Sequence, residues 1–157
     1  MKVLVIRHAV AQDREDFKSF DDDLRPLTSK GKKEFEKVSR SYKKLYPDVQ
    51  EFYSSSLLRA TETADILKKK FKKNYKIIEE LRPESNSLAL LKKLKNSKKN
   101  FVAIIGHEPS LSRFIGQAIV GQKKSIVELK KGGACLLELS RIPKIITLHS
   151  PKSILKT

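Results

Sequence analysis

Two apolar runs that end in a histidine-bearing polar segment are the feature that most constrains the fold of this chain. Residues 3–6 (Val-Leu-Val-Ile) lead into Arg7-His8, and residues 101–105 (Phe-Val-Ala-Ile-Ile) lead into Gly106-His107. Short, β-branched, all-apolar runs are typical of strands buried on both faces of a parallel sheet. In an open parallel sheet the carboxyl ends of the strands lie along one edge, where ligands bind. We therefore expect both histidines at that edge.

The rest of the chain alternates between strand and helix patterns. Thr28 is expected to cap one helix, one of the serines at 54–56 the next, and Ser110 a later one. The alternation predicts one domain over residues 1–157, a three-layer α/β/α sandwich with a mainly parallel sheet and an antiparallel edge. The expected strands are 2–6, 49–53, 75–78 and 101–105, the helices 29–45, 57–71, 87–94 and 110–120, the closing hairpin 134–139 with 144–148, and a frayed tail follows from Ser150.

Composition excludes several classes of protein. A chain of 157 residues with 39% hydrophobic and 33% charged residues suits a globular domain that needs no metal or disulfide to be stable. No apolar run is long enough for a transmembrane helix, and the segment before Arg7 is too short for a signal peptide. A single cysteine, Cys135, excludes an internal disulfide framework. We expect a cytoplasmic monomer with no membrane contact.

The formal net charge of +16 comes mostly from lysine, in clusters at residues 68–73 and 92–99. One interpretation is a surface that attracts a polyanion such as nucleic acid or an acidic protein. The other is a set of solvated helix faces. We favour the second, because the lysines are scattered and few aromatic residues interleave them. Nucleic acid is therefore not expected as a partner.

Arg59, at the start of the helix that follows the second strand, joins the two histidine segments as a candidate site residue. Taken singly, each of these residues could be an ordinary polar side chain at a strand or helix end. Taken together, two guanidinium groups and two imidazoles at one sheet edge could bind a phosphoryl group, and one imidazole could attack it. No cluster has metal-ligand spacing, and residues 121–125 (Gly-Gln-Lys-Lys-Ser) lack the first glycine and the spacing of a Walker loop. We expect no metal or cofactor.

Five motifs in order resemble the histidine phosphatase superfamily, and within it the small SixA-like phosphohistidine phosphatases, over most of the chain. Arg7-His8-Ala9 is similar to the Arg-His-Gly signature, with alanine in place of glycine. Residues 25–31 match the Arg-Pro-Leu-Thr-x-x-Gly stretch, and residues 55–63 match Ser-Pro-x-x-Arg-Ala-x-x-Thr with serine in place of proline. Glu80-Leu81 matches a pair that follows the third strand, and residues 105–109 match the second histidine motif.

The resemblance implies a role for each of these residues. His8 would be the nucleophile and form a phosphohistidine enzyme that water hydrolyses, and an imidazole with a pKa near ~6.5 is largely neutral at cellular pH. Arg7 and Arg59 would clamp the phosphoryl oxygens, and His107 would stabilise the charge of the transferring group. Because the arginines supply positive charge, the reaction would need no metal.

The identity of the general acid and of further binding residues stays open. In larger relatives a glutamate after the third strand protonates the leaving group, and Glu80 is its positional match, with Glu108 as a competitor beside His107. Arg25 is a candidate for substrate binding, and a salt bridge to the Asp21–Asp23 cluster is its alternative. Ser55 is a second candidate, with helix capping as its alternative.

The absence of a long insertion between the third and fourth predicted strands bears on the substrate. Larger relatives insert a helical cap, whereas residues 81–100 leave room for one short helix, so the resemblance implies an open pocket without a cap domain. Such a pocket suits a phosphohistidine on a protein such as a histidine-phosphotransfer domain. The alternatives are a small phosphomonoester (a sugar phosphate or nucleotide), a non-catalytic phosphate or nucleic-acid binding module, and, more weakly, a mutase.

Overall fold

A six-stranded sheet in the order β3-β2-β4-β1-β5-β6 forms the centre of the molecule. The structure, a computed structural model, describes residues 1–156. The strands β1 to β4 pair in parallel, and β5 runs antiparallel to both of its neighbours. This arrangement confirms the predicted α/β fold with a mainly parallel sheet and an antiparallel edge. The strands are β1 (Lys2–Arg7), β2 (Glu51–Ser54), β3 (Tyr75–Ile77), β4 (Phe101–Gly106), β5 (Ala134–Glu138) and β6 (Lys144–His149).

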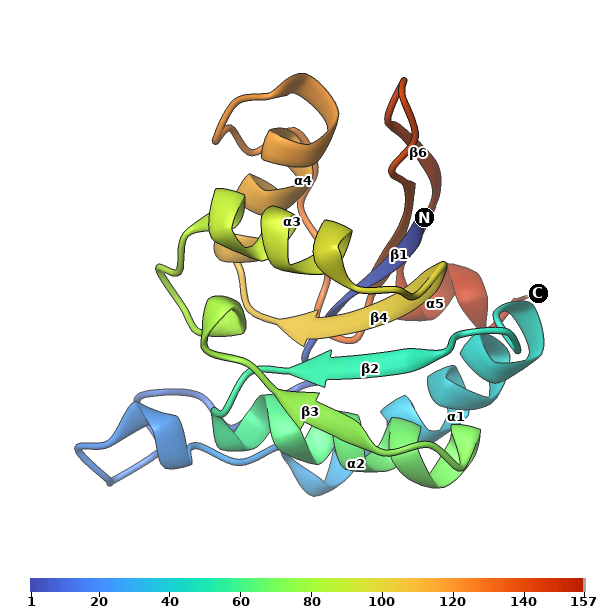
Figure 1. Cartoon of the computed structure of the whole chain (residues 1–157). Coiled ribbons are helices and arrows are strands. Elements are labelled where there is room, and N and C mark those ends of the chain that lie inside the picture. Colours follow the sequence, from blue (N-terminus) through green and yellow to red (C-terminus); the bar gives the residue numbers. More distant parts are fainter. Residues whose placement is uncertain (157) are drawn as a thin grey trace.

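Helices cover the sheet on both faces (Figure 1). On β1, the side chains of Leu4 and Ile6 join one buried cluster and those of Val3 and Val5 join the other, as the two-residue period of a strand requires. The first cluster is shared with α1 (Ser29–Leu45), α2 (Leu58–Phe71) and α5 (Pro151–Ile154), and the second with α3 (Ser87–Asn96) and α4 (Ser110–Val120). The central strands are thus buried on both faces, which explains the continuous apolar runs.

Only short elements separate β3 from β4. They are the 3-10 helix η2 (Glu79–Leu81) and α3, so the structure has no cap domain, as predicted. A long loop between β1 and α1 carries a second 3-10 helix, η1 (Asp22–Leu24). No helix within residues 1–156 combines the length and the apolar character needed to cross a bilayer.

Of the three N-cap residues predicted from the sequence, the structure confirms one. Thr28 caps α1 by accepting a hydrogen bond from the Gly31 N–H at 2.9 Å, as predicted. The prediction that Ser110 caps α4 is wrong, because Pro109 occupies the cap and the Ser110 hydroxyl accepts from the Glu84 N–H instead. At α2 the cap residue is Leu57, so no serine occupies that position.

The prediction of a frayed tail from Ser150 is also wrong. Ser150 caps α5 in a capping box with Ser153, and Pro151 occupies the first turn, where its missing N–H costs nothing. Ile154 is fully buried against the same core as α1 and α2. The tail is therefore anchored both by its cap and by its packing.

Candidate active site

A cavity of about 480 Å³ lies at the edge of the sheet where the parallel strands end. Its walls include Arg7 and His8 from the end of β1, Arg59 from the first turn of α2, and His107 just after β4. Arg25, from the loop between β1 and α1, also lines it. The fold thus gathers at one cavity the four residues that sequence analysis took from three separate segments.

His8 is held in one tautomer by the backbone. Its Nδ1 lies 2.7 Å from the carbonyl oxygen of Ala9, and because a carbonyl only accepts, Nδ1 carries the proton and Nε2 keeps its lone pair. The Ala9 N–H in turn donates to the Thr63 hydroxyl at 3.0 Å, which ties this turn to α2. Burial, reinforced by Arg59 and Arg7, lowers the pKa of His8 to about 3, so the imidazole is neutral near pH 7.

His107 is the second imidazole of the cavity. Its ring centroid lies 5.2 Å from that of His8, with the two planes tilted by 50°. Neither of its ring nitrogens has a hydrogen-bond partner among residues 1–156, although both are buried. Burial and the neighbouring His8 lower the pKa of His107 to about 2. As a neutral ring it still offers one N–H donor to an anion.

Arg7 and Arg59 are each held at the terminal nitrogens. Arg7 Nη1 donates to the carbonyl oxygen of Leu129 at 2.7 Å. Arg59 Nη1 donates to the carbonyl oxygen of Asp22 at 2.9 Å, and its Nη2 pairs with the Asp22 carboxylate at 3.0 Å. The Nε of both arginines is buried without a partner. These contacts fix the guanidinium planes while leaving part of each donor fork unused.

Unpaired buried polar atoms concentrate in this one cavity. Five buried side-chain nitrogen or oxygen atoms lack a partner within residues 1–156, and four of them belong to Arg7, Arg59 and His107. Since buried polar groups are normally satisfied, such a cluster indicates a bound group that supplies acceptors. A phosphoryl group, with several acceptor oxygens and negative charge, has the chemistry required.

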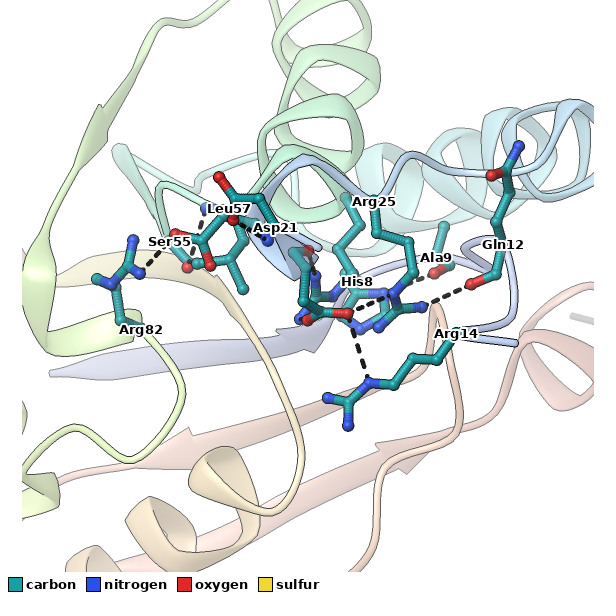
Figure 2. A network of polar contacts seen from close by, with 12 residues as sticks. His8, Ala9, Gln12, Arg14, Asp21, Arg25, Ser55, Leu57 and Arg82 are labelled. Atoms are coloured by element: carbon teal, nitrogen blue, oxygen red, sulfur yellow. Dashed lines mark hydrogen bonds and ion pairs between the residues drawn. The ribbon is translucent and has the colours of Figure 1, made fainter. Parts of the chain in front are cut away.

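Asp22 links three arginines on one side of the cavity. Its carboxylate contacts Arg25 Nε at 2.8 Å and Arg14 Nε at 3.4 Å, besides Arg59. Figure 2 shows Arg25 extending past His8 to the carbonyl oxygen of Gln12, to which it donates at 2.6 Å. Burial alone would raise the pKa of Asp22, but the hydrogen bond from Arg25 and the charges of Arg59 and Arg14 lower it. Both alternatives predicted for Arg25 therefore occur together: its side chain lines the cavity and also forms a salt bridge with Asp22.

Two predicted site residues do not lie at the cavity. The carboxylate of Glu80 pairs with Lys93 at 2.7 Å, on the side of η2 that faces α3, and this hydrogen bond lowers its pKa. A carboxyl that favours its charged form holds no proton to donate, so nothing in the geometry supports Glu80 as general acid. Ser55 is fully buried, and its hydroxyl lies 3.4 Å from the Leu57 N–H.

Sequence reasoning missed several residues of the cavity wall. Arg14 and Lys131 line it, from the two long loops that precede α1 and β5. The carbonyl oxygen of Leu129 contributes through its hydrogen bond from Arg7. No periodicity or motif marks these positions, because they lie in segments without regular structure. Within residues 1–156, no three His, Cys, Asp or Glu side chains gather in a way that could hold a metal ion.

The fold and the cavity define an α/β protein with an anion site built from two imidazoles and several guanidinium groups. The family model for the histidine phosphatase superfamily (branch 1) matches residues 3–86, more than half of the chain. The chain belongs to this superfamily and is a phosphatase of it. It is 28% identical to an uncharacterized protein of Picosynechococcus sp., over 99% of both chains.

Solved structures share this fold. The protein histidine phosphatase SixA in complex with tungstate superposes with a TM-score of 0.82 at 21% identity, covering 97% of this chain and 98% of that one. The alpha-ribazole phosphatase from Shigella flexneri gives a TM-score of 0.74 at 18% identity, covering 96% and 97%. A phosphoserine phosphatase from Entamoeba histolytica, in a mutant form with phosphoserine, gives 0.75 at 15% identity, covering 97% and 98%.

Proposed function

We propose that this phosphatase removes the phosphoryl group from protein phosphohistidine, through a phosphohistidine intermediate on His8 and without a metal ion. The observation that carries the proposal is the cluster of unpaired donors on Arg7, Arg59 and His107 beside an imidazole whose Nε2 keeps its lone pair. A phosphoryl group between them would satisfy those donors and face the nucleophile. Catalysis would then rest on positioning and on electrostatic stabilisation.

The reaction would proceed in two displacements at phosphorus. In the first, Nε2 of His8 attacks, the bond between phosphorus and the leaving nitrogen breaks, and the two arginines with His107 hold the equatorial oxygens. In the second, water attacks, the bond from phosphorus to Nε2 breaks, and inorganic phosphate leaves with its surplus proton passing to solvent. Nδ1 of His8 stays on the Ala9 carbonyl throughout, so Nε2 remains the reacting nitrogen.

The two carboxylates that the sequence offered as general acids are both engaged by other groups, which supports a phosphoramidate substrate. Glu80 is engaged by Lys93, and both oxygens of Glu108 accept hydrogen bonds, from Ser112 and from the Leu129 N–H. A substrate whose leaving group brings its own proton suits such a site. Phosphohistidine is of that kind, because its second ring nitrogen can be protonated before cleavage and the imidazole then leaves neutral.

The surroundings of the cavity support a protein-borne phosphoryl group. Between β3 and β4 the chain forms only η2 and α3, so no inserted domain encloses a small molecule. One of the similar structures is described as a protein histidine phosphatase, and others as phosphatases of small phosphomonoesters. Small phosphomonoesters are accordingly the alternative substrate class.

The test compares the two substrate classes in one assay. A histidine-phosphotransfer domain carrying phosphohistidine, and a panel of sugar phosphates, nucleotides and phosphoserine, are compared by kcat/KM. We expect the phosphoprotein to be preferred by about a hundredfold or more, and loss of phosphate no faster than spontaneous decay would exclude it. An acid-labile phosphoenzyme should form in the wild type and in His149→Gln, which alters the histidine outside the cavity, and should be absent from His8→Ala.

A further inference from the structure

The loop before β5 holds Arg7 in place. Leu129, which is almost completely buried, accepts the hydrogen bond from Arg7 Nη1 at 2.7 Å. The same loop is hydrogen-bonded to the backbone at the end of β1. The Gly132 N–H donates to the carbonyl oxygen of His8 at 2.9 Å, and the Arg7 N–H donates to the carbonyl oxygen of Gly133 at 3.0 Å. Where the Arg7 guanidinium lies therefore depends on where this loop lies.

Glu108 holds that loop at the residue that contacts Arg7. Its Oε1 accepts the Leu129 N–H at 2.9 Å. Its Oε2 accepts from the Ser112 N–H at 3.1 Å and from the Ser112 hydroxyl at 2.7 Å. The carboxylate thus bridges the first turn of α4 and the loop, and all three of its neighbours donate, which suits an ionised group that only accepts.

We propose that Glu108 is a positioning residue for Arg7, acting through the peptide units that flank Leu129. The N–H of Leu129 is anchored on Glu108 and its C=O anchors Arg7, so the carboxylate sets where the guanidinium meets the phosphoryl group. The inference rests on the role of Arg7 in phosphoryl binding, and it assigns to Glu108 a task different from that of a general acid. Such indirect support of substrate-binding groups commonly determines how precisely they are held.

The distinguishing variant is Glu108→Gln, which keeps the shape of the side chain but leaves one acceptor oxygen for three donors. We expect kcat/KM for p-nitrophenyl phosphate to fall by about tenfold or more, and inorganic phosphate to bind more weakly by a similar factor. The matched control is Glu80→Gln, the same change at a carboxylate that Lys93 holds away from the cavity, and it should stay within about twofold of the wild type. If Glu108→Gln does not fold, Glu108→Asp carries the same test with a shortened carboxylate.

A double-mutant cycle separates positioning from the other roles. In an Arg7→Gln background, Glu108→Gln should weaken phosphate binding no further, because the guanidinium it positions is gone. Equal losses in both backgrounds would overturn the inference. So would a loss confined to substrates with poor leaving groups, which would identify a general acid, or unchanged phosphate binding in Glu108→Gln. If only the proposed function is wrong, the wild type should still bind inorganic phosphate and Glu108→Gln should still bind it more weakly, because phosphate binding needs no turnover.

Discussion

At the scale of single residues, the two buried imidazoles set how stability responds to acid. The pKa values of His8 and His107 in the folded protein are about 3 and about 2, whereas in an unfolded chain they lie near ~6.5. Above that pH both states are neutral at these positions. As the pH falls below it, the unfolded chain takes up protons that the folded chain refuses, so stability is lost.

We expect the free energy of unfolding to fall with pH by up to about 1.4 kcal/mol per unit for each such histidine. Urea unfolding between pH 7.5 and pH 5.5, above the range where most carboxylates titrate, measures this slope. Burial also lowers the pKa of His149, which adds in the same direction. His107→Gln should therefore reduce the slope by about the contribution of one histidine. An unchanged slope would show that the pKa of His107 is the same in the folded and unfolded states.

Asp22 is the second residue whose role can be measured directly. Its carboxylate pairs with Arg59, Arg25 and Arg14, yet it is not among the residues that line the cavity, which favours alignment of the arginines over competition with substrate. Asp22→Asn should lower kcat/KM about tenfold, since a hydrogen bond to a charged group is worth about 1.5–3 kcal/mol. Asp21→Asn, which alters the neighbouring carboxylate, is the control and should have little effect. A rise in kcat/KM would instead mean that Asp22 competes with the phosphoryl group.

Sequence could place Arg7, His8, Arg59 and His107 together because each lies at or shortly after the end of a strand, and the sheet topology fixes where those ends lie. It could not place Asp22 or Leu129, because their contacts join irregular loops far apart in the chain. For Glu80 the sequence predicted the position in the chain but not the direction of the side chain. Its position after β3 fits the family pattern, but the direction of its side chain depends on η2 and on Lys93, and no local pattern encodes that.

At the scale of elements, the start of α1 is built around a close backbone approach. A Cβ on Gly31 would lie 2.2 Å from the carbonyl oxygen of Val10, two residues after His8 in the chain. The same carbonyl accepts the Thr28 N–H at 3.0 Å. This approach gives a physical reason for the glycine that ends the 25–31 motif, and it couples α1 to the backbone of the candidate site.

Gly31→Ala is expected to destabilise the protein even though alanine is the better helix former. The gain in helix propensity is about 1 kcal/mol, whereas overpacking against rigid backbone costs about 1–3 kcal/mol or more. Relief of the clash would displace the 8–11 segment, so we also expect reduced phosphatase activity. Gly121→Ala is the control for backbone strain without a clash, because its Cβ meets nothing within 4 Å but its positive φ disfavours alanine; it should lose some stability and keep its activity. Thermal unfolding and kcat/KM of both variants decide, and a stabilised, fully active Gly31→Ala would contradict the packing argument.

The helices and strands themselves were largely predictable, because apolar periodicity sets them. The exception, α5, is only four residues long and shows no period. Its signal was the capping pattern of Ser150, Pro151 and Ser153, which sequence reasoning did not use. What anchors this helix is Ile154 in the core shared with α1 and α2, a long-range contact that sequence alone does not show.

At the scale of the whole molecule, charge is distributed unevenly. Lysines occupy the last turns of α1 and α2 and the segments just before β3 and β4, which lie at the edge where the parallel strands begin. Acidic residues at 13–23 lie in the loop beside the cavity, at the opposite edge. Lysines at helix C-termini complement the helix dipole, which agrees with the prediction that they form solvated faces. That nucleic acid is not a partner of this basic edge stays a prediction.

A net charge of +16 on 157 residues should make the folded state sensitive to salt. Like charges repel across the compact molecule, and the repulsion is screened when the Debye length falls from about 30 Å at 0.01 M salt to about 10 Å at 0.1 M. The surface ion pairs that salt weakens are each worth about 0–1 kcal/mol. We therefore expect Tm to rise by several degrees over this range.

The double variant Lys33→Glu/Lys98→Glu tests whether repulsion is the cause. Each change removes two units of positive charge, so the net charge falls by four from +16 to +12, and both side chains are exposed. Its Tm at low salt should exceed that of the wild type, and its salt dependence should be smaller, because less repulsion remains to be screened. If both proteins gain equally from sodium chloride, the stabilisation comes from specific ion binding or from general salt effects, and the lysine excess costs the fold little.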